Sequence, residues 1–391
     1  MTPARPALRV AIVGFGWMGQ VHARSYARLL HHYPDVPLRP ELVVVVDPAP
    51  DDRLAVAAAT FGFRHQLTDW RALFAEDLVD AVSVTGPNFV HRDVAVAAAQ
   101  HGKHVWIEKP AGRDVSEAEQ IADAVHAANV QSVVGFNYRH VPAVELTRAH
   151  VAAGDLGRVE HVTIRLLADY SAHPHGGLSW RFERAMAGTG VLGDLVSHGV
   201  DLARFLVGEI AELVSDEATF IARRPKAAAG GSHYAQVEGG ELGEVENEDY
   251  VCALLRWANG ARGTLEASRV AVGEQCSYGF EIHGDRGALA WDFRRMGELR
   301  TCLGQDYLDA RWETRFVSRG DGELGVFQPA SGITMGFDDL KVIEARQFVE
   351  SIAQGKALGP TVDDAVAAAR ALEAMQTSAR ERRWVAVTPT R

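Results

Sequence analysis

The sequence predicts an α/β fold with two domains. Residues 1–136 are expected to form a parallel, doubly wound sheet, and residues 137–391 an α+β domain with an open, mainly antiparallel sheet. As far as residue 136, strand-like apolar runs alternate with helical periods, which is the pattern of a parallel sheet. Beyond that residue several strands follow one another directly, which favours antiparallel pairing. A length of 391 residues also exceeds one ordinary core.

The composition limits the kinds of molecule that the protein is expected to bind. The formal net charge of -11 argues against a general affinity for nucleic acid or for anionic membranes. The three cysteines form no C-x-x-C pair, so neither a disulfide framework nor a thiolate metal site is indicated. The longest apolar runs are strand-sized and no signal-peptide pattern is present. We therefore expect a cytoplasmic protein with a small-molecule substrate and no metal.

The first domain is predicted from alternating elements. We expect strands at residues 8–13, 42–46, 81–84, 104–107 and 131–136, and helices at 18–30, 53–61, 71–74, 90–101 and 115–129.

A glycine loop follows the first strand. Gly14, Gly16 and Gly19 have the spacing G-x-G-x-x-G, which permits a tight turn, close approach of backbone to a pyrophosphate, and close helix packing. A strand precedes this loop and a helix follows it, so the sequence predicts a Rossmann dinucleotide site. Asp47 ends the second strand, where a carboxylate accepts hydrogen bonds from both ribose hydroxyls and repels a 2'-phosphate. NAD is therefore favoured over NADP; a turn aspartate before Pro48 is the alternative.

Two further loops are expected beside the nicotinamide, because ligands of such sheets collect at the carboxyl ends of the strands. These are Thr85 to Asn88 and Glu108 to Pro110. Lys109 follows a buried strand and is a candidate proton donor or acceptor, while Glu108 either holds Lys109 or faces away. The predicted cofactor-binding residues are Gly14, Phe15, Gly16, Trp17, Met18, Gly19, Asp47, Thr85, Pro87, Asn88, His91, Glu108 and Lys109.

The second domain is predicted to contain strands at residues 159–168, 210–220, 248–257, 262–268, 278–283 and 288–292, with helices at 140–153, 188–208, 336–353 and 361–379. The glycine-rich residues 222–245 are interpreted as a mobile loop. Alternating strands leave one sheet face without helices, and exposed apolar sheet faces mark interfaces. We therefore expect a homodimer or homotetramer.

The helix at residues 188–208 carries a polar stripe. Asp194, His198 and Asp201 are spaced i, i+4, i+7 and fall on one face, whereas most other positions are apolar. Buried carboxylates and imidazoles are costly unless they have partners. The stripe either pairs within the protein or faces a polar cavity, and the sequence leaves both open.

Several motifs appear in one order: the glycine loop, T-G-P-N, HGKHVWIEKP, G-x-N-Y-R at residues 135–139, and D-x-x-x-H-x-x-D at residues 194–201. Together they resemble the glucose-fructose oxidoreductase, inositol 2-dehydrogenase and MocA family of NAD(P)-dependent oxidoreductases, over nearly the whole chain. The resemblance implies a Rossmann domain, and a second domain that covers the substrate and builds oligomers. It also implies that Lys109 is the catalytic lysine and that Asp194 and His198 hold and deprotonate a substrate hydroxyl.

Residues 179–182 and the long second loop resemble the levoglucosan and pyranoside 3-dehydrogenase branch of that family. Gly86 and the insertion at residues 227–243 depart from the usual pattern. The substrate expected is a sugar, anhydrosugar, glycoside or inositol, oxidised at ring carbon 3 or its equivalent. The predicted substrate-binding residues are Lys109, Tyr138, Arg139, Tyr170, Trp180, Arg181, Asp194 and His198.

Three other functions stay open. The first is an NADPH-dependent sugar ketoreductase of deoxysugar biosynthesis, which Asp47 opposes. The second is a metalloenzyme with zinc on His173, His175, Asp194 and His198, since H-x-H and D-x-x-x-H are plausible ligand spacings. The third is a non-catalytic dinucleotide-binding sensor, which the presence of Lys109, Asp194 and His198 disfavours.

Overall fold

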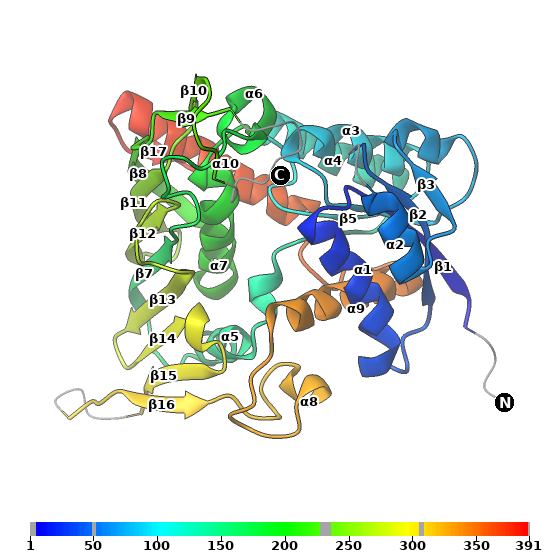
Figure 1. Ribbon diagram of the computed structural model, residues 1–391. Helices are drawn as coiled ribbons and strands as arrows, with labels where there is room; N and C mark the ends of the chain where they lie inside the picture. The colour runs from blue at the N-terminus through cyan, green and yellow to red at the C-terminus, as the bar shows by residue number, and fades with distance from the viewer. Residues whose placement is uncertain (1–4, 49–51, 227–235, 305–308, 390–391) are drawn as a thin grey trace. The chain divides into compact units, whose positions relative to one another are not determined.

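The computed structural model describes residues 5–48, 52–226, 236–304 and 309–389 (Figure 1). The chain divides into two compact units. The first comprises Met1–Asn137 with Gly336–Val366, and the second comprises Tyr138–Met335 with Ala367–Arg391. The first change of unit falls next to the predicted boundary at residue 136. The segment Gly336–Val366 belongs to the first unit, whereas the sequence-based ranges place it in the second domain.

The first unit contains a six-stranded parallel sheet of order β3-β2-β1-β4-β5-β6. Its central strands are short, β-branched and almost entirely buried, as expected for a sheet covered on both faces. The order reverses between β1 and β4, which is where doubly wound sheets bind ligands. The strands are β1 (Ala7–Val13), β2 (Arg39–Val46), β3 (His65–Leu67), β4 (Ala81–Val84), β5 (His104–Ile107) and β6 (Ser132–Val134).

Helices of the first unit connect these strands, and two of them begin or end at residues that stabilise a helix end. Asp114 caps α4 by accepting from the Glu117 N–H, and Gly62 ends α2 in the left-handed conformation. From far along the chain, α9 packs beside α1. The helices are α1 (Trp17–His32), α2 (Arg53–Phe61), η1 (Trp70–Phe74), α3 (Asn88–Gln100), α4 (Val115–Ala128) and α9 (Phe337–Gln354); η2 (Asn137–His140) starts at the last residue of this segment and continues into the second unit.

The second unit contains a nine-stranded sheet of order β16-β15-β14-β13-β7-β12-β11-β8-β17. The pair β7 and β12 is parallel, and the other neighbours are antiparallel. This confirms the predicted fold class. The strands are β7 (Val159–Leu167), β8 (Ile210–Ala218), β11 (Tyr250–Trp257), β12 (Arg262–Ser268), β13 (Ser277–Gly284), β14 (Ala288–Asp292), β15 (Glu298–Cys302), β16 (Glu313–Phe316) and β17 (Val385–Ala386).

One face of this sheet is packed against helices. A Cβ at Gly199 would lie 2.5 Å from a Leu166 methyl, so glycine at that position lets α7 approach β7 closely. Ser215 of β8 donates to the Met375 carbonyl of α10. The helical segments that start in this unit are α5 (Pro142–Ala153), η3 (Trp180–Phe182), α6 (Arg184–Ala187), the π-helical turn η4 (Leu192–Val196), α7 (Ser197–Val207), η5 (Phe293–Arg295) and α8 (Leu324–Phe327); α10 (Val362–Glu381) runs into it.

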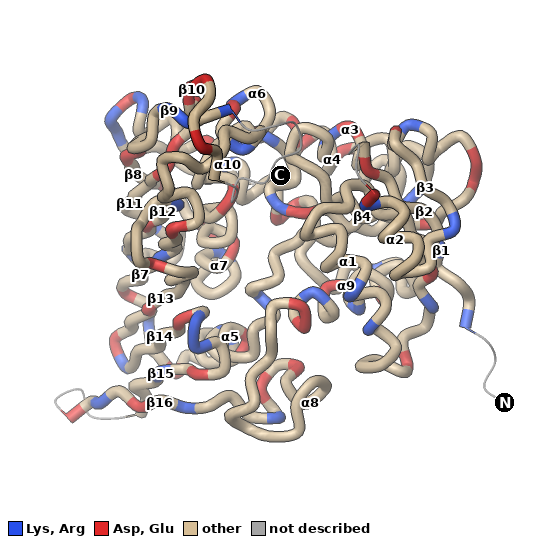
Figure 2. The backbone as a smooth tube through the Cα atoms, in the orientation of Figure 1, with Lys and Arg blue, Asp and Glu red and all other residues tan. Residues whose placement is uncertain are grey.

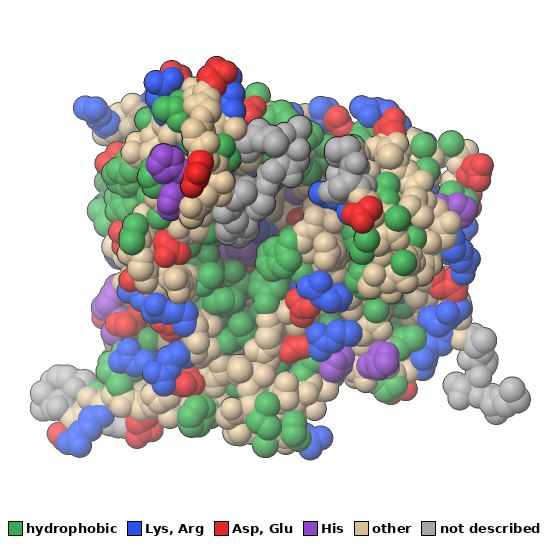
Figure 3. Space-filling view, in the orientation of Figure 1, with side chains coloured by type: hydrophobic (Ala, Val, Ile, Leu, Met, Phe, Trp, Pro, Cys, Tyr) green, Lys and Arg blue, Asp and Glu red, His purple; other side chains and the backbone are tan. Residues whose placement is uncertain are grey.

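The opposite sheet face carries mixed side chains in cross-strand rows. Thr163, Glu281 and Arg300 belong to one row, and Leu254 of the same row is 51% exposed. Figure 2 shows charges of both signs along these strands, and over β13 to β15 Figure 3 shows basic and acidic side chains next to one another. This open face is the one on which the predicted oligomerisation depends.

Several elements differ from the sequence-based prediction. The predicted loop at residues 222–245 contains an antiparallel pair, β9 (Arg223–Pro225) and β10 (Leu242–Glu244). Residues 227–235, within the same predicted loop, lie outside the described residues. The short strands β3, β15, β16 and β17 were not predicted, because two to five residues show too few alternations to be recognised. Among the helices that the structure describes, none is long and apolar enough to cross a membrane; the cytoplasmic location stays a prediction.

Candidate active site

The glycine loop is closely packed against the end of β4. Gly14 has φ +91°, and a Cβ there would lie 2.4 Å from the Gly86 Cα. A Cβ at Gly19 would lie 2.1 Å from the Gly14 carbonyl oxygen, which also accepts from the Thr85 hydroxyl at 2.6 Å. Around Gly16, by contrast, a Cβ would meet nothing within 4 Å. The loop therefore offers open backbone at the N-terminus of α1, which fits a pyrophosphate.

Asp47 lies at the end of β2, as predicted. Its Oδ2 accepts from the Phe15 N–H at 2.6 Å and lies 3.5 Å from Nη1 of Arg53. The carboxylate is thus fixed to the glycine loop, in the place where dinucleotide-binding folds hold the adenosine ribose. A purely structural aspartate could make the same bond, so contact of Asp47 with the ribose stays a prediction.

Trp17 and Met18 open helix α1. The Trp17 side chain is 64% exposed and its ring stacks on Phe337 of α9, with centroids 5.3 Å apart. Met18 is half-buried. Both backbone groups belong to the first turn of α1, where N–H groups are available to an anion.

His91 joins the two predicted loops. Its Nδ1 lies 2.8 Å from the Pro110 carbonyl oxygen, and its Nε2 lies 2.8 Å from the Gly86 carbonyl oxygen. Burial lowers the pKa of His91, although both carbonyls oppose this shift. Pro87 and Asn88 start α3 at the same place. The loops at residues 85–88 and 108–110 are therefore brought together within the first unit, as the sequence predicted, while a contact of His91 with cofactor stays a prediction.

Glu108 faces the interior of the first unit. Its Oε1 accepts from Nζ of Lys341 at 2.6 Å and from Nε2 of His22 at 2.9 Å. Lys341 also donates to Glu344 at 2.8 Å, and His22 stacks on Trp106. We call His22, Glu108, Lys341 and Glu344 the buried charge cluster.

Gly135 makes room for this cluster, since a Cβ there would lie 2.6 Å from the Glu108 carboxylate. The Glu108 carboxylate is thus already bound by side chains of the protein, and these bonds anchor the end of β5, which Lys109 follows. The bonds of Glu108 go to His22 and Lys341 in the interior. A role of Glu108 in holding Lys109 and its contact with cofactor both stay predictions. Sequence reasoning missed His22, Lys341 and Glu344.

The charge states within the cluster follow from burial and pairing. Burial alone would raise the pKa of Glu108, but the Lys341 ammonium and the His22 hydrogen bond hold it below its usual range. Burial raises the pKa of Glu344 to about 8 and lowers the pKa of His22 to about 4. At neutral pH the cluster is therefore one ion pair, Glu108 with Lys341, accompanied by a neutral carboxyl and a neutral imidazole.

In the second unit, Asp194 is the centre of a polar group. Its Oδ2 accepts from the Tyr170 hydroxyl, and its Oδ1 lies 3.9 Å from Nη1 of Arg181. The side chain of Asp194 is 29% exposed and that of Arg181 is 35% exposed. Burial, and then the Asp194 charge, raise the pKa of Tyr170 well above its usual value, so this phenol stays a hydrogen-bond donor. Trp180 lies under the Arg181 guanidinium at 4.6 Å.

His198, one turn further along, is flanked by aromatic rings. Tyr138 stacks on it with centroids 4.3 Å apart, and Tyr138 in turn contacts Phe293 and Tyr278. His198 is 7% exposed. Four residues predicted to bind substrate, Tyr170, Trp180, Arg181 and Asp194, thus form one group, while Tyr138 and His198 form a stacked pair.

Arg139 has a different surrounding. Its Nε donates to Oδ2 of Asp201 at 2.9 Å, and its guanidinium lies over the Phe205 ring. Asp201, the third residue of the predicted stripe, is 2% exposed. The stripe therefore divides: Asp201 pairs within the protein, whereas Asp194 is partly accessible. Contact of Arg139 with substrate stays a prediction.

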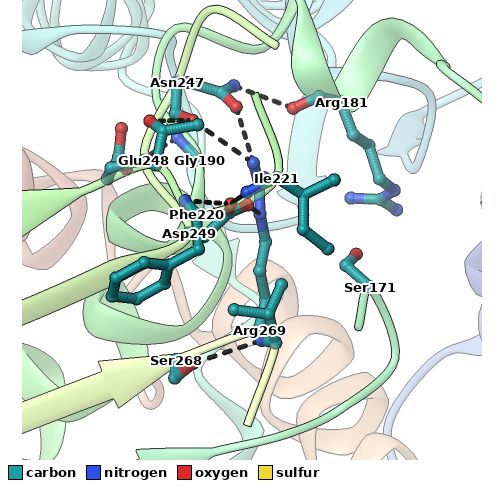
Figure 4. Close-up of polar contacts among 12 residues, drawn as sticks. Ser171, Arg181, Gly190, Phe220, Ile221, Asn247, Glu248, Asp249, Ser268 and Arg269 are labelled. Carbon is teal, nitrogen blue, oxygen red and sulfur yellow. Dashed lines mark hydrogen bonds and ion pairs between the residues drawn. The ribbon is translucent and has the colours of Figure 1, made fainter. Parts of the chain in front are cut away.

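A buried network holds the segments that carry Arg181 and Asp194 (Figure 4). Asn247 donates to the Arg181 carbonyl at 2.8 Å and accepts from Arg269 at 2.8 Å. Glu248 accepts from the Gly190 and Leu192 N–H groups, at the start of the helical turn that contains Asp194. Asp249 accepts from Arg269 and from two further N–H groups, those of Phe220 and Ile221.

The network was not predicted. The acidic run at residues 246–249 was its only sequence signal, and such a run more often lies on a solvated surface.

No group of three or more His, Cys, Asp or Glu side chains in the described part of the chain is arranged to hold a metal ion. The zinc candidates His173 and His175 have ring centroids 5.6 Å apart. They form no such group with Asp194 and His198.

Two family models match the chain. Residues 8–136 match the oxidoreductase family with an NAD-binding Rossmann fold, and residues 144–290 match the GFO/IDH/MocA C-terminal domain.

Known proteins are similar along almost the whole length. The chain is 35% identical to the levoglucosan dehydrogenase of Pseudarthrobacter phenanthrenivorans, over 97% of this chain and 98% of that one. It is 27% identical to the inositol 2-dehydrogenase of Rhizobium meliloti, over 97% and 99%. A solved levoglucosan dehydrogenase in complex with NADH and levoglucosan matches with a TM-score of 0.90 and 33% identity, covering 98% of this chain and 100% of that one.

Proposed function

Since the chain belongs to the GFO/IDH/MocA family of oxidoreductases, we propose that it oxidises a secondary ring hydroxyl of a sugar, anhydrosugar, glycoside or inositol, at ring carbon 3 or its equivalent. The chain is an NAD-dependent dehydrogenase of carbohydrate or cyclitol CH–OH groups. The observation that carries the finer proposal is the partly exposed Asp194 carboxylate, held by Tyr170 and near Arg181. A fixed acceptor of this kind orients a substrate hydroxyl.

The cofactor fits residues of the first unit. The open backbone at Gly16 and the N-terminus of α1 suit the pyrophosphate, and Asp47 suits the ribose. When bound, NAD accepts a hydride from the carbon that carries the hydroxyl. Asp47 repels a 2'-phosphate, so we expect NAD to be used at least tenfold more efficiently than NADP, a discrimination of ~1.4 kcal/mol.

The alcohol needs a base, because it releases hydride only as its proton leaves. We propose His198 as the general acid/base and Asp194 as the group that orients the hydroxyl. Lys109 stabilises the developing alkoxide or serves as the alternate base. The Tyr138 ring stacks on His198 and holds the imidazole in one plane, so that the ring nitrogens keep a fixed direction.

The substrate side suits a polyhydroxylated ring. Trp180 provides a flat apolar surface, Arg181 with Tyr170 provides hydrogen bonding, and the Tyr138 ring backs His198. Sugar rings bind in this way because their faces are apolar and their edges are hydroxyls. Contact of all four residues with substrate is part of the proposal.

A panel of inositols, aldoses, anhydrosugars and glycosides tests the proposal, with NAD and the absorbance of NADH as the readout. Levoglucosan is the first compound because the relative of 35% identity is a levoglucosan dehydrogenase. We expect oxidation of at least one ring that has a free 3-hydroxyl, and none of its 3-deoxy analogue. Equal oxidation of the 3-deoxy analogue contradicts the choice of carbon, and inactivity with every compound contradicts the substrate class.

We also propose a homodimer or homotetramer assembled through the open sheet face of the second unit. Leu254 of β11, the third strand from the β17 edge of that face, is 51% exposed. Leu254→Glu should lower the mass measured by light scattering, whereas Val56→Glu, on an exposed position of α2, should not. A monomer mass for the unaltered protein, independent of concentration, would remove this proposal.

A further inference from the structure

A cation lies beside the residue that selects NAD. Nη1 of Arg53, the first residue of α2, is 3.5 Å from Oδ2 of Asp47. The Arg53 side chain is 32% exposed, whereas that of Asp47 is 7% exposed. The guanidinium is therefore accessible from outside, although the carboxylate partly neutralises it.

The position of this pair is fixed by packing. Phe15, whose N–H bonds Asp47, packs its ring edge-on against Phe61 of α2 and against Phe63. Ala57 of α2 belongs to the same apolar cluster. Since one residue anchors both the carboxylate and the helix, Arg53 and Asp47 stay at a defined separation.

The Asp47 carboxylate and the Arg53 guanidinium favour different nucleotides. A carboxylate at the end of the second strand accepts from the ribose 2'-hydroxyl, and an arginine near it accommodates a 2'-phosphate. A guanidinium binds phosphate through two parallel N–H bonds, and Arg53 stands at the N-terminal end of a helix, where the dipole adds to the attraction.

We propose that Arg53 is a latent site for the 2'-phosphate of NADP, masked by the charge of Asp47. The inference rests on the cofactor of the proposed function and goes beyond it. The carboxylate has two effects: it repels the 2'-phosphate, and it holds the arginine that would bind it. Neutralising Asp47 therefore removes a repulsion and releases a phosphate ligand at once.

The test measures binding by calorimetry, without any sugar. The ligands are NAD, NADP, and the minimal pair 5'-AMP and 2',5'-ADP, which differ by the 2'-phosphate. The proteins are the unaltered chain, Asp47→Asn, and Asp47→Asn combined with Arg53→Gln. Asparagine is chosen because its amide oxygen still accepts from the Phe15 N–H. The matched control combines Asp47→Asn with Arg64→Gln, since Arg64 is an exposed arginine that pairs with Glu41.

Asp47→Asn should bind NADP and 2',5'-ADP at least tenfold more tightly than the unaltered chain. Adding Arg53→Gln should remove at least fivefold of that gain, whereas adding Arg64→Gln should keep it. The gain should also shrink between 50 and 500 mM NaCl, because it is electrostatic.

The proposal is overturned if Asp47→Asn with Arg53→Gln binds 2',5'-ADP as tightly as Asp47→Asn alone. It is also overturned if Asp47→Asn gains nothing while its thermal unfolding and 5'-AMP affinity match those of the unaltered chain. No sugar is present in this test, so its outcome does not depend on the sugar panel. Inactivity with every sugar would contradict the substrate class, but the effect of Asp47 and Arg53 on NADP binding could still be measured.

Discussion

Each unit contains a hydrogen-bonded carboxylate with a cation nearby: Glu108 in the buried charge cluster, and Asp194 in the group that it forms with Tyr170, Trp180 and Arg181. These two groups differ in how far water reaches them. In the buried charge cluster the side chains of Lys341 and Glu344 are 1% and 0% exposed. In the Asp194 group the side chains of Asp194 and Arg181 are 29% and 35% exposed. Both groups contain a hydrogen-bonded carboxylate, but one is closed to water and the other is open to it.

The difference shows how to separate structural charges from chemical ones. A fully buried charge is tolerated only when the protein supplies its partners, and Lys341 supplies them for Glu108. A partly exposed carboxylate that is fixed by a phenol keeps capacity for a further hydrogen bond. We infer that the buried charge cluster supports Lys109, while the Asp194 group meets substrate. The four predictions below test that separation.

The largest effect is expected at the proposed catalytic residues. Lys109→Ala and His198→Ala should each lower turnover by roughly two to four orders of magnitude. The double variant should be no slower than the worse single variant, because both groups act on one proton. NAD binding should persist, since neither side chain belongs to the proposed pyrophosphate or ribose sites. Near-normal turnover of His198→Ala beside an inactive Lys109→Ala would show that His198 only packs against Tyr138.

The next effect concerns stability. Lys341→Met leaves Glu108 buried without its ammonium, and should lower the free energy of unfolding by about 3–5 kcal/mol. Lys103→Met is the control in the same unit: Lys103 pairs with Asp77, whose side chain is 76% exposed, so it should cost less than about 1 kcal/mol. Urea unfolding measures both. Equal losses of unfolding free energy in the two variants would mean that the buried charge cluster contributes no more to stability than an exposed ion pair.

A smaller change is expected in the Asp194 group. Tyr170→Phe removes a hydrogen bond to a carboxylate, a contribution of about 1.5–3 kcal/mol, so kcat/KM should fall by roughly 10- to 150-fold. The stability should change less than in Lys341→Met. A loss of stability without a loss of kcat/KM would assign Tyr170 and Asp194 to structure instead.

The smallest effect is a pH dependence of stability from the buried charge cluster. Glu344 has its pKa raised to about 8, so the folded chain binds an extra proton and stability falls as pH rises toward 8. His22 has its pKa lowered to about 4, so its own contribution to stability falls as pH decreases from about 6.5 toward 4. Down to about pH 4.5 the Glu344 contribution has the opposite slope, so the His22 slope is measured in the Glu344→Gln variant. Urea unfolding at several pH values measures both slopes. Glu344→Gln should flatten the slope between pH 6.5 and 8, and an unchanged slope in that variant would refute the assignment.

Much of the first unit could be predicted because its signals are local. Gly14, Gly16 and Gly19 lie within six residues, and the apolar runs of the strands need no distant partner to be recognised. Asp47 and the two loops followed from the rule that parallel strands end at one edge. The same locality explains why Lys109 and Asp194 could be chosen before any contact was known.

What the sequence did not disclose depends on distant pairing. Lys341 is separated from Glu108 by more than 230 residues, and in sequence it is only a lysine inside an amphipathic helix. His22 likewise resembles any polar residue of α1. The partners of Asn247 and Asp249 lie on three other segments, so no spacing predicts them.

The π-helical turn η4 allows the segment that carries Asp194 to lose one residue during evolution and still form a helix. A π-turn is equivalent to one residue inserted into an α-helix, and such turns often occur at functional sites. Loss of a single residue between Leu192 and Val196 would restore a regular helix without disturbing the buried ends of the segment. It would also rotate Asp194 by about 100° relative to α7. Relatives with a one-residue deletion at this place would therefore keep the fold while presenting a different side chain to substrate.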